Sequence, residues 1–155
     1  MKDFAGKAAF ITGGAGGIGL AMARAFGQRG MKVAIADVEA ETCARAVEAL
    51  RRENIEAIGT ACDVSDREAL AEAANRTFAE FGKVHVLCNN AGVSRAGPIE
   101  AIAASDWDWV IGVNLKPHSR LAVVPAAHEG AWRGRPYRQH RLDQWCRRRA
   151  ARGSL

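Results

Sequence analysis

A glycine-rich stretch, TGGAGGIG at residues 12–19, has the composition of a loop that binds the pyrophosphate of a dinucleotide. A turn without Cβ atoms lets the backbone approach a phosphate, and a following helix offers its free N–H groups and positive dipole end. Gly14, Gly16 and Gly19 fit the pattern G-x-G-x-x-G. The pattern alone is a weak signal, because glycine clusters also form ordinary turns.

An acidic residue, Asp37, stands 18 residues after Gly19, close to the spacing of about 20 expected for a carboxylate that binds the adenosine ribose. Such a carboxylate accepts hydrogen bonds from both ribose hydroxyls and repels a 2′-phosphate. No Arg or Lys stands in the glycine turn or at Val38 to neutralise that phosphate. The pattern therefore predicts NAD in preference to NADP, and the alternative reading of Asp37 is a plain helix N-cap.

The elements that must position these residues alternate between apolar runs and amphipathic segments. Strands are predicted at 7–12, 32–37, 56–63 and 84–90, and helices at 18–30, 39–54, 65–82 and 105–115. We expect Gly30 and Gly82 to end two helices, a Ser-Asp pair at 65–66 to start one, and Ser105 or Asp106 to cap the last. The alternation predicts an α/β fold, a Rossmann-type doubly wound parallel sheet that is incomplete, with about four strands.

Three further motifs lie at the ends of these predicted elements. ACDV (61–64) and NNAG (89–92) each follow a strand, and VNL (113–115) comes one helix later. Together with T-G-x-x-x-G-x-G at the glycine turn, they closely resemble the short-chain dehydrogenase/reductase family over about residues 4–115. The resemblance implies an NAD(P)-dependent oxidoreductase that transfers hydride between NAD and a small-molecule alcohol/ketone pair.

The resemblance also implies roles for individual residues. Asp63 and Val64 would flank the adenine, and Asn114 would kink its helix and hold a water in a proton relay. His85 departs from the acid that most members carry there, and we interpret it as a strand-end histidine. Asn89 is expected to be a satisfied buried amide or to join adjacent strands. The cofactor contacts implied by the family are Thr12, Gly13, Gly17, Ile18, Gly19, Asp37, Asp63, Val64, Asn90, Ala91 and Gly92.

The chain lacks the catalytic set that the family uses, a serine and a tyrosine four residues before a lysine. Its single tyrosine is Tyr137, and the residue four positions later is Arg141. Arginine is not equivalent to lysine at such a site, because it does not deprotonate and has a different shape. We therefore predict that the chain as written is catalytically incomplete, with Asn114 as the remaining member of the proton relay.

The chain changes character after Asn114. Residues 1–114 contain 12 Lys+Arg and 15 Asp+Glu, a net charge of −3, whereas residues 115–155 contain 10 and 2, a net charge of +8. We predict a dinucleotide-binding half at 1–115 and an irregular basic tail at 116–155. Shifting that tail by one base, with synonymous codons, can produce a family-like helix and strand, so we interpret the tail as a frameshift product. The alternatives are a non-catalytic NAD-binding or oligomerising module, and a nucleic-acid-binding protein that uses the tail.

Other features narrow the class of protein. The four cysteines, Cys43, Cys62, Cys88 and Cys146, have no CxxC spacing, so we expect reduced thiols and no metal site. No apolar run reaches the roughly 20 residues of a membrane helix, and no signal peptide is recognised. We therefore expect a cytoplasmic protein with no membrane partner, and nucleic acid is not the expected ligand. The family resemblance leaves a homo-oligomer open.

Overall fold

A computed structural model describes residues 3–117 of the chain. Within them four parallel strands form one sheet, in the order β3-β2-β1-β4. Their bounds are Ala8–Thr12 for β1, Lys32–Asp37 for β2, Ala57–Ala61 for β3 and Val86–Cys88 for β4. Ala9 of β1 stands opposite Val33 on one side and Val86 on the other, so β1 lies between two partners. The predicted Rossmann-type parallel sheet is confirmed.

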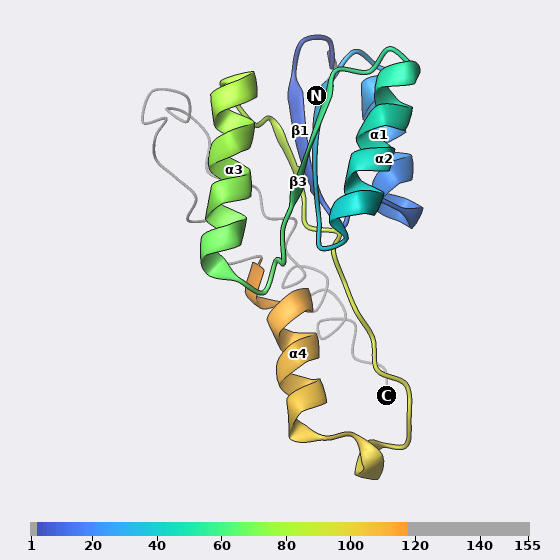
Figure 1. The fold of residues 1–155 in the computed structure, drawn as a ribbon, viewed down its shortest axis with the longest axis vertical. Helices are drawn as coiled ribbons and strands as arrows, with labels where there is room; N and C mark the ends of the chain where they lie inside the picture. Colours follow the sequence, from blue (N-terminus) through green and yellow to red (C-terminus); the bar gives the residue numbers. More distant parts are fainter. Residues whose placement is uncertain (1–2, 118–155) are drawn as a thin grey trace, which may run out of the picture. The chain divides into compact units, whose positions relative to one another are not determined.

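Helices cover both faces of this sheet (Figure 1). Helices α1 (Gly17–Gly27) and α2 (Ala40–Arg52) pack on one face, and α3 (Arg67–Phe81) packs on the other. The short 3-10 helix η1 (Ile99–Ala101) and helix α4 (Ala104–Asn114) follow β4. This arrangement is the doubly wound one expected of strand–helix alternation.

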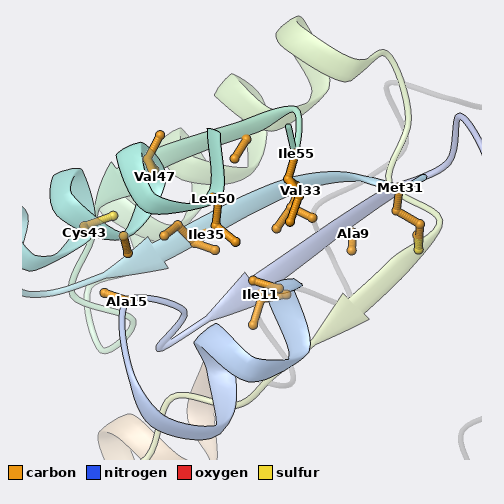
Figure 2. Packing of buried hydrophobic residues seen from close by; sticks show 13 residues of the cluster. Ala9, Ile11, Ala15, Met31, Val33, Ile35, Cys43, Val47, Leu50 and Ile55 are labelled. Carbon is orange, nitrogen blue, oxygen red and sulfur yellow. The ribbon is translucent and has the colours of Figure 1, made fainter. Parts of the chain in front are cut away.

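The core on the α1/α2 face follows from alternation along the strands (Figure 2). Ile11 of β1 and Ile35 of β2 project to this face and are at most 1% exposed. The buried residues of α2 recur at helical spacing, and they are Cys43, Ala46, Val47 and Leu50. Fully burying a large aliphatic side chain such as Ile11, Ile35 or Leu50 stabilises the fold by about 1.5–3 kcal/mol.

The opposite face has a second core. Phe10, which lies between Ala9 and Ile11 in β1, packs there with Leu70 and Ala73 of α3. Val113 joins this cluster and is, with Gly112, one of the two buried residues of α4. Most of α4 is exposed, including its apolar residues Trp107, Trp109 and Ile111, and so is Leu115, which follows it.

Several predicted element ends are confirmed and others are wrong. Asp66 caps α3 by accepting hydrogen bonds from Glu68 N and Ala69 N, and Gly82 follows that helix with a φ of 73°. Helix α1 ends at Gly27 rather than at residue 30. The expected cap of α4 is wrong, since its N-cap is Ala103 and no side chain caps it.

The remaining expectations on topology concern segments at or beyond the end of α4. The boundary at residues 115/116 falls directly after α4, and the predicted basic tail lies outside the described residues from position 118 on. Tyr137, Arg141 and Cys146 belong to that part. Among the described residues no helix is long and apolar enough to cross a membrane. The homo-oligomer and the cytoplasmic location stay predictions.

Candidate functional site

The predicted site residues converge on the edge of the sheet where the strands end. All strands are parallel, so the glycine turn after β1, Asp37 at the end of β2 and Asn90 after β4 meet at one edge. The chain runs from β1 outward to β3 and then crosses to the other side of β1. The strand order therefore reverses between β1 and β4, which is where open α/β sheets form their ligand crevice.

The glycine turn has a conformation and a tightness that side chains would disturb. Gly13 and Gly17 have φ values of 62° and 50°, in the left-handed region that favours glycine. A Cβ on Gly19 would lie 2.0 Å from the carbonyl oxygen of Gly13, and one on Gly14 would lie 2.6 Å from Ile35. The family set of Gly13, Gly17 and Gly19 thus occupies demanding positions, and Gly14 is needed for packing.

The tip of the turn faces open space. Gly16, Gly17 and Ile18 are exposed, and a Cβ on Gly16 or Gly17 would meet nothing within 4 Å. Gly16 is the N-cap of α1 and no side chain caps that helix. The first N–H groups of α1 are thus not covered by a capping side chain, which is the arrangement that binds an anion at a helix N-terminus.

Asp37 is tied directly to the glycine turn. Its Oδ2 accepts a hydrogen bond from Ala15 N at 3.0 Å, and its Oδ1 accepts one from Glu39 N at 3.3 Å. The N-cap of α2 is Glu39, so the alternative reading of Asp37 as that cap does not describe its position. Val38, which follows Asp37, has an apolar side chain and is 63% exposed. The sequence patterns did not assign it to the site.

Thr12 joins the ends of β1 and β4 through its hydroxyl. Its Oγ1 accepts hydrogen bonds from Asn90 N and Ala91 N, both at 3.1 Å, and donates to Cys88 O at 3.4 Å. A hydroxyl has one donor and two acceptor positions, so this one is fully used. Thr12 is also 1% exposed. Its side chain therefore holds the ends of β1 and β4 together, and its assignment as a cofactor contact stays a prediction.

Asn90 clamps the start of the glycine turn. Its Nδ2 donates to the carbonyl oxygens of Thr12 at 3.0 Å and of Gly13 at 3.1 Å. The neighbouring Asn89 differs from its expected role, because its buried Oδ1 has no hydrogen-bond partner within the described part of the chain. Ala91 is half-buried and Gly92 is exposed at the edge of the sheet.

Asn114 at the end of α4 is paired with the loop that follows β4. Its Oδ1 accepts from Val93 N at 2.8 Å, and its Nδ2 donates to Val93 O at 2.9 Å. The amide thus holds α4 beside the loop that contains Gly92. The side chain is occupied in this position, so a part in a proton relay would fall to its main-chain groups.

Asp63 and Val64 follow β3 at the same edge. The Asp63 carboxylate is exposed, and its Oδ1 accepts from Ser65 N at 2.8 Å, which closes a turn before α3. Val64 is 5% exposed and packs into the core against α3. Asp63 is thus placed on the surface of the site, whereas the Val64 side chain points into the protein.

The ionisable side chains do not form a metal site or a reactive thiol in the described region. No group of three or more His, Cys, Asp or Glu residues there could hold a metal ion. Burial, with nearby Asp63, Asp66 and Glu72, raises the pKa of the Cys62 thiol to about 11. Burial also raises the pKa of Cys88. These thiols stay protonated at neutral pH, and the thiol form is a poor nucleophile.

Comparisons with known proteins agree with this geometry. The sequence model described as short chain dehydrogenase matches residues 7–129, which extends beyond the expected limit at 115. The chain is 50% identical over 116 residues to a C alpha-dehydrogenase of Sphingobium sp., covering 74% of this chain and 38% of that protein. It is 39% identical over 110 residues to a D-threitol dehydrogenase of Mycolicibacterium smegmatis, covering 71% and 42%.

Solved structures show the same likeness. A short-chain dehydrogenase/reductase from Burkholderia phymatum in complex with NAD has a TM-score of 0.77 at 41% identity, covering 80% of this chain and 44% of that one. A putative short-chain dehydrogenase from Novosphingobium aromaticivorans has a TM-score of 0.76 at 42% identity, covering 80% and 46%. The chain thus spans less than half the length of these proteins.

Proposed function

The chain belongs to the short-chain dehydrogenase family, and from this membership we propose that residues 1–115 bind NAD as the cofactor half of an alcohol/ketone oxidoreductase. The observation that carries the proposal is the hydrogen bond from Ala15 N to Asp37 Oδ2, which joins the glycine turn to a carboxylate at one sheet edge. A loop for the pyrophosphate and an acceptor for the ribose hydroxyls then stand side by side.

The residues at this edge fit NAD. The N-terminus of α1 and the tip at Gly17 would hold the pyrophosphate, and Asp37 would accept from the ribose hydroxyls. The exposed side chain of Val38 would flank the adenine, and that of Ile18 the nicotinamide side. Bound NAD would supply the hydride acceptor, and the role of these residues is to orient it.

The preference for NAD over NADP rests on charge. A 2′-phosphate bound at the ribose would stand beside the Asp37 carboxylate, and like charges at that distance repel. The glycine turn at residues 12–19 contains no Lys or Arg to offset the repulsion, and Val38 is apolar. Asp37 therefore acts both as an acceptor for NAD and as a barrier to NADP.

We further propose that the chain as written binds NAD without turning over a substrate. The general acid/base of the family is a tyrosine whose pKa a nearby lysine lowers, and Tyr137 has Arg141 at the corresponding spacing. The pocket for the alcohol or ketone would come from parts of the family fold that this chain does not match. We thus expect the chain to bind the cofactor and not to catalyse the reaction.

Ligand-dependent unfolding of the whole chain tests the cofactor assignment. NAD at about 100 times its Kd should add about 2.7 kcal/mol to the free energy of unfolding, and NADP at the same concentration should add much less. Asp37→Asn removes the charge but keeps an oxygen for Ala15 N. This variant should therefore narrow the difference between NAD and NADP in the free energy of unfolding that each adds. Glu39→Ala is the matched control, because Glu39 makes no side-chain cap bond to α2.

The outcomes separate the parts of the proposal. Equal stabilisation by NAD and NADP would overturn the role of Asp37, and stabilisation by neither would overturn cofactor binding itself. Turnover is measured separately, from the absorbance of reduced nicotinamide with a panel of secondary alcohols that includes D-threitol. We expect binding without turnover, and clear turnover would contradict the assignment of the chain as catalytically incomplete.

A further inference from the structure

A histidine side chain takes part in the pairing of β1 with β4. In the register of these strands Ala9 stands opposite Val86, which places Ala8 opposite His85 at the amino end of the pair. His85 N donates to Ala8 O at 2.8 Å. In the other direction, Ala8 N donates to His85 Nδ1 at 3.0 Å. The imidazole therefore stands where a neighbouring strand would ordinarily offer a main-chain carbonyl.

This bond exists in one protonation state only. Nδ1 accepts a hydrogen bond when it has no proton, so the neutral ring must be the tautomer with its hydrogen on Nε2. Protonation makes both ring nitrogens donors, and two donors then face each other. Ala8 is 1% exposed, so its N–H would lose its partner in a place that water reaches poorly.

We propose that His85 is an acid-sensitive latch between β1 and the amino end of β4, closed when the ring is neutral and opened when the ring takes up a proton. The proposal rests on the contact with Ala8 and on the position of β4, and it does not depend on the proposed cofactor function. Strand β4 pairs only with β1 among the described residues, through the three positions Val86, Leu87 and Cys88. A strand of this length depends strongly on each of its hydrogen bonds.

The surroundings of His85 favour the neutral ring. His85 is an exposed residue, but the partial desolvation of its ring lowers its pKa, and the cationic side chains of Lys7 and Lys83 lower that pKa further. Lys7 precedes β1, Lys83 precedes β4, and β1 itself has no ionisable side chain. Neither strand thus offers a carboxylate that would stabilise an imidazolium at this position.

The lowered pKa of His85 determines how the stability of the folded chain changes with pH. The pKa of His85 is lower in the folded chain than its ordinary value of 6.5, so the unfolded chain binds the proton more tightly. The stabilisation is therefore fully present above pH 6.5 and is lost as the pH falls through the pKa of the folded chain. The opened latch frees the amino end of the strand that leads into Asn90.

Amide hydrogen exchange of the full chain, followed by NMR, tests the latch at the Ala8 N–H itself. Between about pH 7.5 and about pH 5 we expect the protection factor of Ala8 to fall about tenfold. His85→Asn places an Oδ1 where Nδ1 stands and does not titrate, so this variant should keep Ala8 protected at both pH values. His85→Leu offers no acceptor and should leave Ala8 poorly protected at both.

The comparison with His85→Asn also removes other sources of pH dependence. The three other histidines, His118, His128 and His140, are present in both proteins and so are matched in the comparison. Parallel loss of Ala8 protection in the wild-type chain and in His85→Asn would overturn the proposal, and so would constant protection in the wild type. If His85→Leu does not fold, the wild-type and asparagine pair still decides the question.

Discussion

At the scale of single residues, the glycine turn depends on the close approach of Gly19 to the carbonyl of Gly13. A Cβ on Gly19 would lie 2.0 Å from that oxygen and 2.7 Å from Nδ2 of the Asn90 side chain, which leaves it no room. Gly19→Ala should therefore destabilise the chain by about 1–3 kcal/mol and abolish binding of NAD, because the turn must move. Urea unfolding and an NAD titration measure the two effects.

Gly16→Ala is the control for this prediction. Gly16 has extended backbone, with a φ of −155°, and a Cβ there meets nothing within 4 Å. Both variants add one methyl group within the glycine-rich stretch at residues 12–19, and they differ in the space that receives it. Equal losses of stability in the two variants would contradict the steric argument for Gly19.

The hydroxyl of Thr12 supports a second prediction. Thr12→Val keeps the shape of the side chain but leaves the N–H groups of Asn90 and Ala91 without their shared acceptor. Leaving a buried donor unpaired costs about 1–3 kcal/mol, so we expect a loss of at least this size in the free energy of unfolding. Thr12→Ser restores the oxygen and should recover most of it, and a serine variant as weak as the valine variant would assign the effect to the lost methyl group.

Thr12 also shows what a motif leaves out. The family pattern places a threonine before the glycines, and proximity to the turn suggests contact with the cofactor. The pattern does not reveal that Asn90, which lies 78 residues further along the chain, uses the same hydroxyl. Asp37 was easier to assign, because its role follows from the strand that it ends and from its distance to the glycines.

At the scale of elements, Asn114 connects α4 to the loop after β4. Asn114→Ala removes both hydrogen bonds to Val93, and each contributes about 0.5–1.5 kcal/mol. The loop should open more often, and trypsin should cleave faster after Arg95, two residues beyond Val93. The initial rate of cleavage at Arg95 measures this opening.

The ion pair between Arg95 and Asp106 provides the control for this measurement. It joins the same loop to the same helix at 3.4 Å, but the Arg95 side chain is 60% exposed. An exposed pair contributes about 1 kcal/mol or less, so Asp106→Asn should change the cleavage rate less than Asn114→Ala does. The reverse order would mean that the ion pair, and not the amide, holds the loop.

Some ends of helices and strands are set by the local sequence, and others are set by contacts with distant residues. The start of α3 was predictable, because Asp66 caps it through its own side chain. The start of α4 was not, since Ala103 supplies no side-chain cap and the predicted polar residues lie inside the helix. Strand β4 begins later than expected, at Val86, and it ends earlier, at Cys88, because Asn90 bonds to Thr12 and Gly13 instead of continuing the ladder.

At the scale of the whole molecule, the parallel sheet with helices on both faces was predictable from strand–helix alternation, whereas no such pattern accounts for the sequence of the basic tail. Its net charge of +8 at residues 115–155 and its lack of a Tyr-x-x-x-Lys set support the proposal that it is a frameshift product. The gene read past codon 116 in a shifted frame should then encode a serine strand and a tyrosine four residues before a lysine. Restoring one base should restore turnover, and the absence of such a frame would refute the proposal.

The position of β1 has a consequence for the order of events during synthesis. Strand β1 is buried along its whole length and lies at the centre of the four described strands, yet it is the first of them to be made. Its outer partner ends 76 residues later, at Cys88. At about 5–20 residues per second, this gap takes the ribosome about 4–15 seconds. Until β4 is made, the edge of the buried strand β1 that β4 will cover stays unpaired, so slower elongation should increase the exposure of this edge to chaperones.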